Sequence, residues 1–235
     1  MVQDEEQEVK TQLYDQFALI GKALGSARRL EIIDLLAQSE YTVEKLAEET
    51  NMSVANTSQH LKTLRAARLV EVRREGVVAY YRLSDDAVFL TWQMIRDLGE
   101  ACIAEIEWLA DRLFEDRDQQ GLIPFAELLA LLEEATVSVV DVRPEQEFRA
   151  GHIQGASSIP LRELSSRMRE IDKDKEVVVY CRGPYSTLAN KAAKTLLAKG
   201  YSVRRLEQGF PEWRIQGLPI SREGVKFTLG DENRE

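Results

Sequence analysis

Residues 176–186 read EVVVYCRGPYS, which is a short apolar run, a cysteine, and a loop that contains glycine and proline. The apolar run is typical of a strand that is buried on both faces of a sheet. The residues after Pro184 predict a turn into a helix that ends near Ala198. Cys181 therefore stands at the carboxyl end of a strand, where open α/β sheets place their functional sites.

The segments on both sides of this strand alternate between strand-like and helix-like patterns. Runs of β-branched residues predict strands, and apolar residues spaced three and four apart predict helices. The predicted strands span residues 136–142 and 202–206, and the predicted helices span residues 125–133, 145–149, 161–171 and 210–216. This alternation indicates an α/β domain with a mostly parallel central sheet that is covered on both faces.

The first half of the chain has a mainly helical pattern. Residues 7–24 and 29–38 carry apolar residues at helical spacing. Thr42 and Ser53 are expected to cap two short helices joined by a polar turn of about four residues, which is a helix-turn-helix. Residues 69–83 then alternate as two strands around a Glu75-Gly76 turn, which predicts a hairpin. Ser84 is expected to cap a long helix that continues through residue 117.

The second short helix has an exposed polar face. Its amide and hydroxyl side chains are of the type that hydrogen-bonds base edges, and its cations suit phosphate contacts. A basic hairpin directly after such a helix is typical of a winged helix-turn-helix, so we expect double-stranded DNA as a partner. A generic polar helix followed by a generic hairpin is the alternative. The expected DNA contacts are Ser53, Asn56, Thr57, Ser58, Gln59, His60, Lys62, Arg65, Arg73 and Arg74.

The formal net charge of −9 is unevenly distributed along the chain. Residues 1–120 carry all of this negative charge, whereas residues 121–235 have a net charge of 0. Within the acidic half, residues 51–82 form a basic island with a net charge of +4. Local concentration of charge matters more for nucleic-acid binding than the total does. We therefore expect DNA binding that depends steeply on salt.

The long helix predicted at residues 84–117 carries an apolar seam with alternating spacings of three and four. Such a seam suits packing against another helix. Because residues 7–24 carry a similar stripe, a homodimer is the economical way to bury both, with two recognition helices reading a pair of half-sites. Cys102 lies in the seam and is expected to be a small buried apolar side chain. A redox role for Cys102 is the alternative.

Composition excludes several classes of protein. The chain has 235 residues, of which 44% are hydrophobic and 30% charged, as is ordinary for a folded soluble protein. Two cysteines are too few for a disulfide-stapled secreted scaffold. No apolar run approaches the roughly 18 residues of a membrane span, and the acidic N-terminus is unlike a signal peptide. We therefore expect a cytoplasmic protein that does not contact a membrane.

Residues 10–115 resemble the ArsR/SmtB family of bacterial repressors, most clearly at Leu46-Ala47, residues 53–64 and residues 67–70. The resemblance implies a dimeric DNA-binding protein that releases its operator when an inducer binds. Metal-sensing members use cysteine clusters near the recognition helix, or His/Asp/Glu pairs on the last helix. Residues 39–64 contain no cysteine and the last helix contains no histidine, so we expect neither a metal nor another cofactor.

Residues 122–220 resemble a rhodanese-like domain. Three groups of motifs carry the resemblance: residues 141–148 with 151–156 and 159–160, residues 178–183, and residues 209–213 with 217–219. The resemblance implies that Cys181 carries sulfur. It also implies an active-site loop and a framework beneath that loop. The loop residues are Arg182, Gly183, Tyr185, Ser186 and Thr187, and the framework residues are Asp141, Arg143 and His152.

The position of Cys181 suits a reactive thiolate. Backbone N–H groups of the loop and the N-terminus of the following helix are expected to favour the charged form of the sulfur. Arg182 adds positive charge, or pairs with a carboxylate at the edge of the sheet. We expect Asp141 and Arg143 to form an ion pair or hydrogen bonds beneath the loop. A buried structural cysteine is the alternative reading of Cys181.

Two positions in the loop depart from related patterns. Typical rhodanese-like domains carry an arginine at the position of Ser186, where it helps to bind anionic donors such as thiosulfate. Regulator–rhodanese hybrids often read Cys-Arg-Gly-Pro-Tyr-Cys, so Ser186 replaces a second thiol. Phosphatases and arsenate reductases with a Cys-x5-Arg loop carry an arginine at the position of Thr187. Their transition states need that cation, so we expect neither activity.

These observations predict three segments: a winged-helix and dimerisation domain at residues 1–118, a rhodanese-like domain at 119–225, and a tail at 226–235. We expect a dimeric transcriptional regulator, most simply a repressor, that senses reactive sulfur through persulfidation of Cys181. Its expected partners are operator DNA, a second copy, and a small donor such as a polysulfide, persulfide or thiosulfate. One alternative is an active sulfurtransferase with an attached DNA-binding domain. Another is a sensor of arsenic or selenium oxyanions that uses Cys181.

Overall fold

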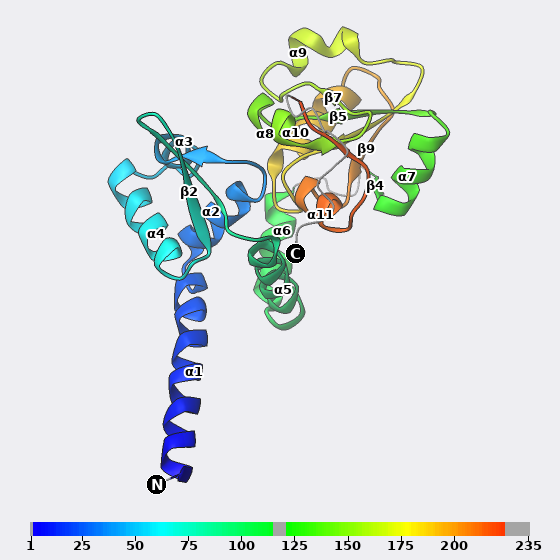
Figure 1. Cartoon of the computed structure of the whole chain (residues 1–235). Coiled ribbons are helices and arrows are strands. Elements are labelled where there is room, and N and C mark those ends of the chain that lie inside the picture. Colours follow the sequence, from blue (N-terminus) through cyan, green and yellow to red (C-terminus); the bar gives the residue numbers. More distant parts are fainter. Residues whose placement is uncertain (1, 115–120, 224–235) are drawn as a thin grey trace, which may run out of the picture. The chain divides into compact units, whose positions relative to one another are not determined.

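The structure is a computed structural model that describes residues 2–114 and 121–223 (Figure 1). The chain divides into two compact units, Met1–Glu107 and Trp108–Glu235. The division lies within a helix, ahead of the expected boundary at residues 118 and 119. That boundary and the tail at residues 226–235 lie outside the described residues. Within residues 2–114 and 121–223, no helix has the length and apolarity that a membrane crossing requires.

The first unit is mainly helical and contains one small sheet. Strand β3 lies between β1 and β2, and pairs antiparallel with both. The elements are α1 (Val2–Leu24), α2 (Ala27–Leu36), β1 (Tyr41–Thr42), α3 (Val43–Glu49), α4 (Val54–Ala66), β2 (Val70–Glu75), β3 (Val78–Leu83), α5 (Asp86–Cys102) and α6 (Ala104–Leu113), the last of which continues into the second unit.

The predicted helix-turn-helix is confirmed in its order and in both caps. The Thr42 side chain accepts a hydrogen bond from the backbone N–H of Lys45, at 3.3 Å. The Ser53 side chain accepts one from Asn56, at 3.2 Å. Asn51 has a φ of +52° in the turn between the two helices, a conformation that asparagine tolerates better than most residues. These local signals fix where α3 and α4 begin, so α4 follows the turn as predicted.

The long helix predicted from Ser84 through residue 117 is wrong in two respects. Asp85 rather than Ser84 caps α5, because its carboxylate accepts the N–H of Ala87 at 2.7 Å. The helix is also interrupted at Ile103, where φ is −122° and ψ is 95°, and α6 begins after it. Cys102 at the end of α5 is exposed in the single chain, so the burial predicted for it depends on a second copy.

The second unit is an α/β domain, as predicted. Its elements are β4 (Leu122–Ile123), α7 (Phe125–Glu133), β5 (Val137–Asp141), α8 (Glu145–Ala150), β6 (His152–Ile153), β7 (Ser157–Ser158), α9 (Leu164–Arg167), the 3-10 helix η2 (Met168–Glu170), β8 (Glu176–Tyr180), α10 (Thr187–Leu197), β9 (Val203–Leu206), α11 (Phe210–Ile215) and β10 (Ile220–Ser221).

A parallel sheet with the strand order β4-β9-β8-β5-β7 forms the centre of this unit. Alternate residues of β8 face opposite sides of the sheet. Val177 and Val179 belong to a core that includes Ala192 of α10. Val178 and Tyr180 belong to another that includes Trp213 of α11. The sheet is therefore buried on both faces, which confirms the interpretation of the apolar run at residues 176–180.

The helix predicted at residues 161–171 is wrong in extent. Only Leu164–Arg167 is α-helical, and a 3-10 turn follows it. The N–H of Leu161 instead donates to the carbonyl of Val142, at 3.1 Å, so this stretch begins as an extension of the sheet edge. The two-residue strands β4, β6, β7 and β10 were not predicted, because two residues are too few to show a period.

Gly209 allows the start of α11 to approach the Cys181 loop closely. A Cβ on Gly209 would lie 2.4 Å from the backbone carbon and oxygen of Arg182 and from the nitrogen of Gly183. The N–H of Phe210 donates to the carbonyl oxygen of Cys181, at 3.1 Å. Two backbones in contact leave no room for a side chain, so position 209 requires glycine.

We expect Gly209→Ala to lower the free energy of unfolding by about 3 kcal/mol, because rigid backbone must move to admit the methyl group. Urea denaturation of the full chain measures this. Gly121→Ala is the matched control, since its Cβ would meet the flexible side chain of Arg204 at 3.3 Å. Its expected cost is below about 1 kcal/mol. Equal stability of the two variants would contradict the close-approach account.

Candidate functional site

The outer face of α4 carries most of the residues predicted to contact DNA. Ser53, Asn56, Ser58, Gln59, Lys62 and Arg65 are all exposed. The Ser53 side chain is also used as the helix cap. Asn56 and Gln59 have amide groups that can both donate and accept hydrogen bonds, which is what base-edge recognition requires. The face therefore has the polarity predicted from the sequence.

The expected exposure of Thr57 is wrong. Its side chain is fully buried, and its hydroxyl donates to the carbonyl of Ser53, at 3.1 Å. Thr57 lies on the same inner side of α4 as Leu61 and Leu64, which are core residues. Helical periodicity places positions 57, 61 and 64 together, so the error lay in counting a polar residue as an exposed one.

His60 is half-buried on α4. Burial lowers the pKa of its imidazole below the usual value, and the positive charges of Arg29 and Arg28 lower it further. The side chain is therefore held toward its neutral form, in which one ring nitrogen donates and the other accepts. It contributes hydrogen-bonding capacity to this face rather than a permanent charge.

The cations of the basic island fall into two groups. Arg73 on the hairpin pairs with Glu40 at 2.8 Å and Glu75 at 3.1 Å. Hydrogen bonds to Glu40 and then Glu75 raise its pKa. Arg82 pairs with Glu71 at 2.9 Å. The other four cations of the basic island make no ion pair with a described residue: Lys62, Arg65, Arg68 and Arg74.

Cys181 follows the last residue of β8, and its side chain is buried. Its sulfur lies 3.8 Å from the carbonyl oxygens of Gly183 and Ser186, the arrangement of a thiol that donates a weak hydrogen bond. The sequence predicts loop N–H groups facing the sulfur, whereas its two hydrogen-bond contacts here are with carbonyl acceptors. Ser186 is the N-cap of α10, with its hydroxyl 3.5 Å from the N–H of Leu188.

Arg182 is held by a carboxylate, as one of its two predicted roles requires. Its Nε and Nη2 lie 2.8 and 2.6 Å from Oε1 of Glu147 on α8, whose side chain is fully buried. Glu147 lies within the motif at residues 141–148, and no role was predicted for it. The sequence around Glu147 carries no signal for this pairing, because Arg182 lies 35 residues further along the chain. Gly183, Tyr185, Ser186 and Thr187 are all partly exposed in the loop.

The ion pair predicted between Asp141 and Arg143 is present, and both side chains are fully buried. Nη2 of Arg143 lies 2.6 Å from Oδ2 of Asp141 and donates to the carbonyl of Gly151 at 2.7 Å. Its guanidinium lies 4.3 Å from the ring centroid of Phe210. Burial opposes the charge of Arg143, but Asp141 and its hydrogen bonds raise the pKa overall. The pKa of Tyr180 is raised by burial and then by Asp141.

His152, the third predicted framework residue, is buried beside Phe148. Its Nδ1 lies 2.9 Å from the carbonyl oxygen of Phe148, and the two rings stack at 3.7 Å. Its contacts are those of a packing residue. Among the described residues, no group of three or more His, Cys, Asp or Glu side chains is arranged to hold a metal ion.

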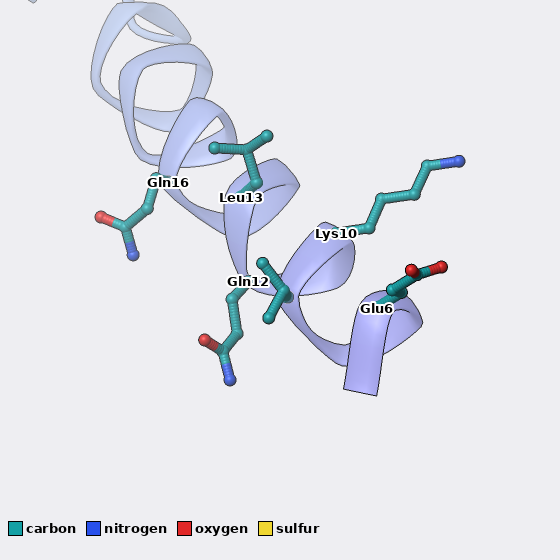
Figure 2. A pocket seen from close by; sticks show the side chains of 6 residues that line it. Glu6, Lys10, Gln12, Leu13 and Gln16 are labelled. Atoms are coloured by element: carbon teal, nitrogen blue, oxygen red, sulfur yellow. The ribbon is translucent and has the colours of Figure 1, made fainter. Parts of the chain in front are cut away.

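A separate hollow lies along α1, on the first unit (Figure 2). It is lined by Glu6, Val9, Lys10, Gln12, Leu13 and Gln16, all from the one helix. The apolar side chains of Leu13, Phe17 and Ile20 are exposed on α1, as are Met94 and Leu98 on α5. Both helices therefore leave apolar surface uncovered in the single chain.

Comparison with known proteins agrees with both halves of the structure. Residues 26–72 match the bacterial regulatory proteins of the arsR family, and residues 125–216 match the rhodanese-like domain. The HTH-type transcriptional regulator Rv0324 of Mycobacterium tuberculosis is 41% identical over 223 residues, which cover 94% of this chain and 97% of that protein. The chain belongs to the ArsR family of DNA-binding transcriptional regulators, in a form with a C-terminal rhodanese-like domain.

Two further similarities cover one half each. A sulfurtransferase of Allochromatium vinosum is 36% identical over 91 residues, or 38% of this chain and 83% of that protein. A solved homodimeric winged helix-turn-helix DNA-binding domain from Mycobacterium bovis is 40% identical, with a TM-score of 0.39. It covers 41% of this chain and 89% of that one.

We expect Lys62→Ala to weaken operator binding about tenfold and to lower the slope of log affinity against log salt by about one, since an unpaired cation is lost from phosphate. Fluorescence anisotropy over a salt series, with a duplex selected from a random library, measures both. Arg82→Ala is the matched control, because Glu71 already pairs with that cation. Equal losses in the two variants would contradict the division of the basic island.

Proposed function

We propose that this regulator senses reactive sulfur, and that persulfidation of Cys181 changes its affinity for operator DNA. The observation that carries the proposal is the placement of Cys181. Its thiol is buried at the end of the central strand and beside the start of α10, in a domain joined to a DNA-binding unit. The N-terminus of α10 beside this thiol favours the thiolate, which is the form that attacks sulfur.

The proposed reaction is a thiolate displacement. The Cys181 thiolate attacks the outer sulfur of a persulfide R–S–SH, forms a new S–S bond, and releases R–S⁻ with the electron pair of the broken S–S bond. No further oxidant is needed, because the donor already carries sulfane sulfur. The product is a persulfide on Cys181.

Persulfidation changes the interactions between the sulfur and the peptide groups of the loop. In the thiol form the sulfur faces the carbonyl oxygens of Gly183 and Ser186. A persulfide anion at the same place is repelled by acceptors and attracted by N–H donors, so the loop must turn its peptide groups. Because Ser186 caps α10 and Cys181 accepts the N–H of Phe210, such a turn is transmitted to two helices.

The operator-binding form is proposed to be a homodimer. Apolar side chains are exposed on α1 and α5. Their burial against a second copy is energetically favourable, which supports a homodimer. Two copies of α4 then contact two half-sites. In each copy the base contacts are assigned to Asn56 and Gln59, and the phosphate contacts to the cations without ion pairs.

A second candidate function is sulfur transfer. It is favoured by the similarity to the sulfurtransferase of Allochromatium vinosum, which spans most of that protein. Ser186 argues against sulfur transfer, because typical rhodanese-like domains carry an arginine at this position that helps to bind anionic donors. Steady-state turnover with a persulfide donor and a small thiol acceptor distinguishes the two functions: an enzyme turns over many times, whereas a sensor stops after one sulfur.

We expect treatment with a small alkyl persulfide to change operator affinity about tenfold, within the usual range of coupling between sites. Cys181→Ala should abolish the response, and Cys102→Ala, which removes the other free thiol, should leave it intact. Mass spectrometry of the same samples locates the added sulfur. Unchanged affinity on treatment, or an unchanged response in Cys181→Ala, would exclude the proposal.

A further inference from the structure

The Cys181 loop contains one basic side chain, and a buried carboxylate binds it. Among residues 181–187 only Arg182 is basic. Both its Nε and its Nη2 contact Oε1 of Glu147, at 2.8 and 2.6 Å. The Arg182 side chain is 17% exposed and that of Glu147 is 0% exposed, so the pair is largely shielded from water. A donor that approaches the sulfur therefore meets almost no net charge from Arg182 and Glu147 together.

The other charged side chains that hold the loop do not restore a positive charge. Asp141 and Arg143 form a second buried pair. Glu212 of α11 is buried, and its Oε2 accepts the N–H of Gly209, at 3.1 Å. Its Oε1 lies 3.8 Å from the point where a Cβ on Gly183 would stand. The guanidinium groups of Arg143 and Arg182 are therefore both bound to carboxylates.

The remaining attraction for an anion comes from backbone. The N-terminus of α10 supplies roughly half an elementary charge. That partial charge suits an uncharged donor that becomes an anion only as it reacts. It is too small to offset both charges of thiosulfate.

We propose that Glu147 is a specificity-determining residue, which by binding Arg182 selects uncharged alkyl persulfides over dianionic thiosulfate as donors to Cys181. The inference rests on the proposed persulfidation and adds the class of donor. An alkyl persulfide carries no charge in the R–S–SH form that a thiolate attacks. With thiosulfate, the same attack forms the same Cys181 persulfide, breaks the S–S bond of the donor, and releases sulfite with the electron pair.

The test compares the rates at which the two donors add sulfur to Cys181, followed by mass spectrometry of the full chain. Glu147→Gln keeps the size of the side chain but removes its charge, so Arg182 regains a net positive charge. We expect the ratio of the thiosulfate rate to the alkyl persulfide rate to rise about tenfold. Adding Arg182→Gln to this variant should return the ratio to that of the unmodified protein.

Glu145→Gln is the matched control, because Glu145 lies on the same helix but pairs with Arg149 on the surface. It should leave the ratio unchanged. A folded Glu147→Gln protein with an unchanged ratio would overturn the inference while leaving persulfidation intact. Failure of both donors to modify Cys181 in the unmodified protein would overturn the proposed function as well.

A measurement on the unmodified protein covers the case in which Glu147→Gln does not fold. A site with net attraction for thiosulfate reacts more slowly as salt rises, because salt screens the attraction. We expect the thiosulfate rate to stay constant or rise with salt, and the alkyl persulfide rate to stay constant. A thiosulfate rate that falls several-fold between low and physiological salt would overturn the inference.

Discussion

The buried ion pair between Asp141 and Arg143 is the interaction on which the second unit depends. Asp141 ends β5 beside Tyr180, the last residue of β8, and Arg143 reaches the carbonyl of Gly151. Because removing one partner of such a pair strands a charge in the interior, at a cost of about 3–5 kcal/mol, neither residue is replaceable alone. The pair holds the end of β8 in place, and Cys181 is the next residue along the chain.

Ion pairing also decides which charges are available for function. On the first unit, Arg73 and Arg82 belong to the basic island but are bound to glutamates, whereas Lys62 has no ion pair among the described residues. On the second unit, Arg182 stands next to the reactive sulfur but is bound to Glu147. A count of basic residues therefore overstates the positive field at both sites. The partners determine how strongly each site attracts phosphate or a sulfur donor.

Most helices, the central strands and the placement of Cys181 could be predicted from the sequence, because their signals are local: caps at Thr42 and Ser53, and an apolar run before the cysteine. The errors have different causes. Ile103 interrupts a continuous helical pattern, and Thr57 turns a polar side chain inward. Glu147 lies 35 residues before Arg182, so the sequence near either residue does not indicate that the two side chains pair.

The central claim is that sulfur on Cys181 and DNA on α4 are thermodynamically linked, and linkage is reciprocal. The most direct measurement is the persulfidation equilibrium of Cys181 against a fixed ratio of alkyl persulfide to thiol, with and without saturating operator DNA. The account predicts that operator shifts this equilibrium by the same factor by which persulfidation changes operator affinity. An equilibrium that is the same with and without operator would contradict it.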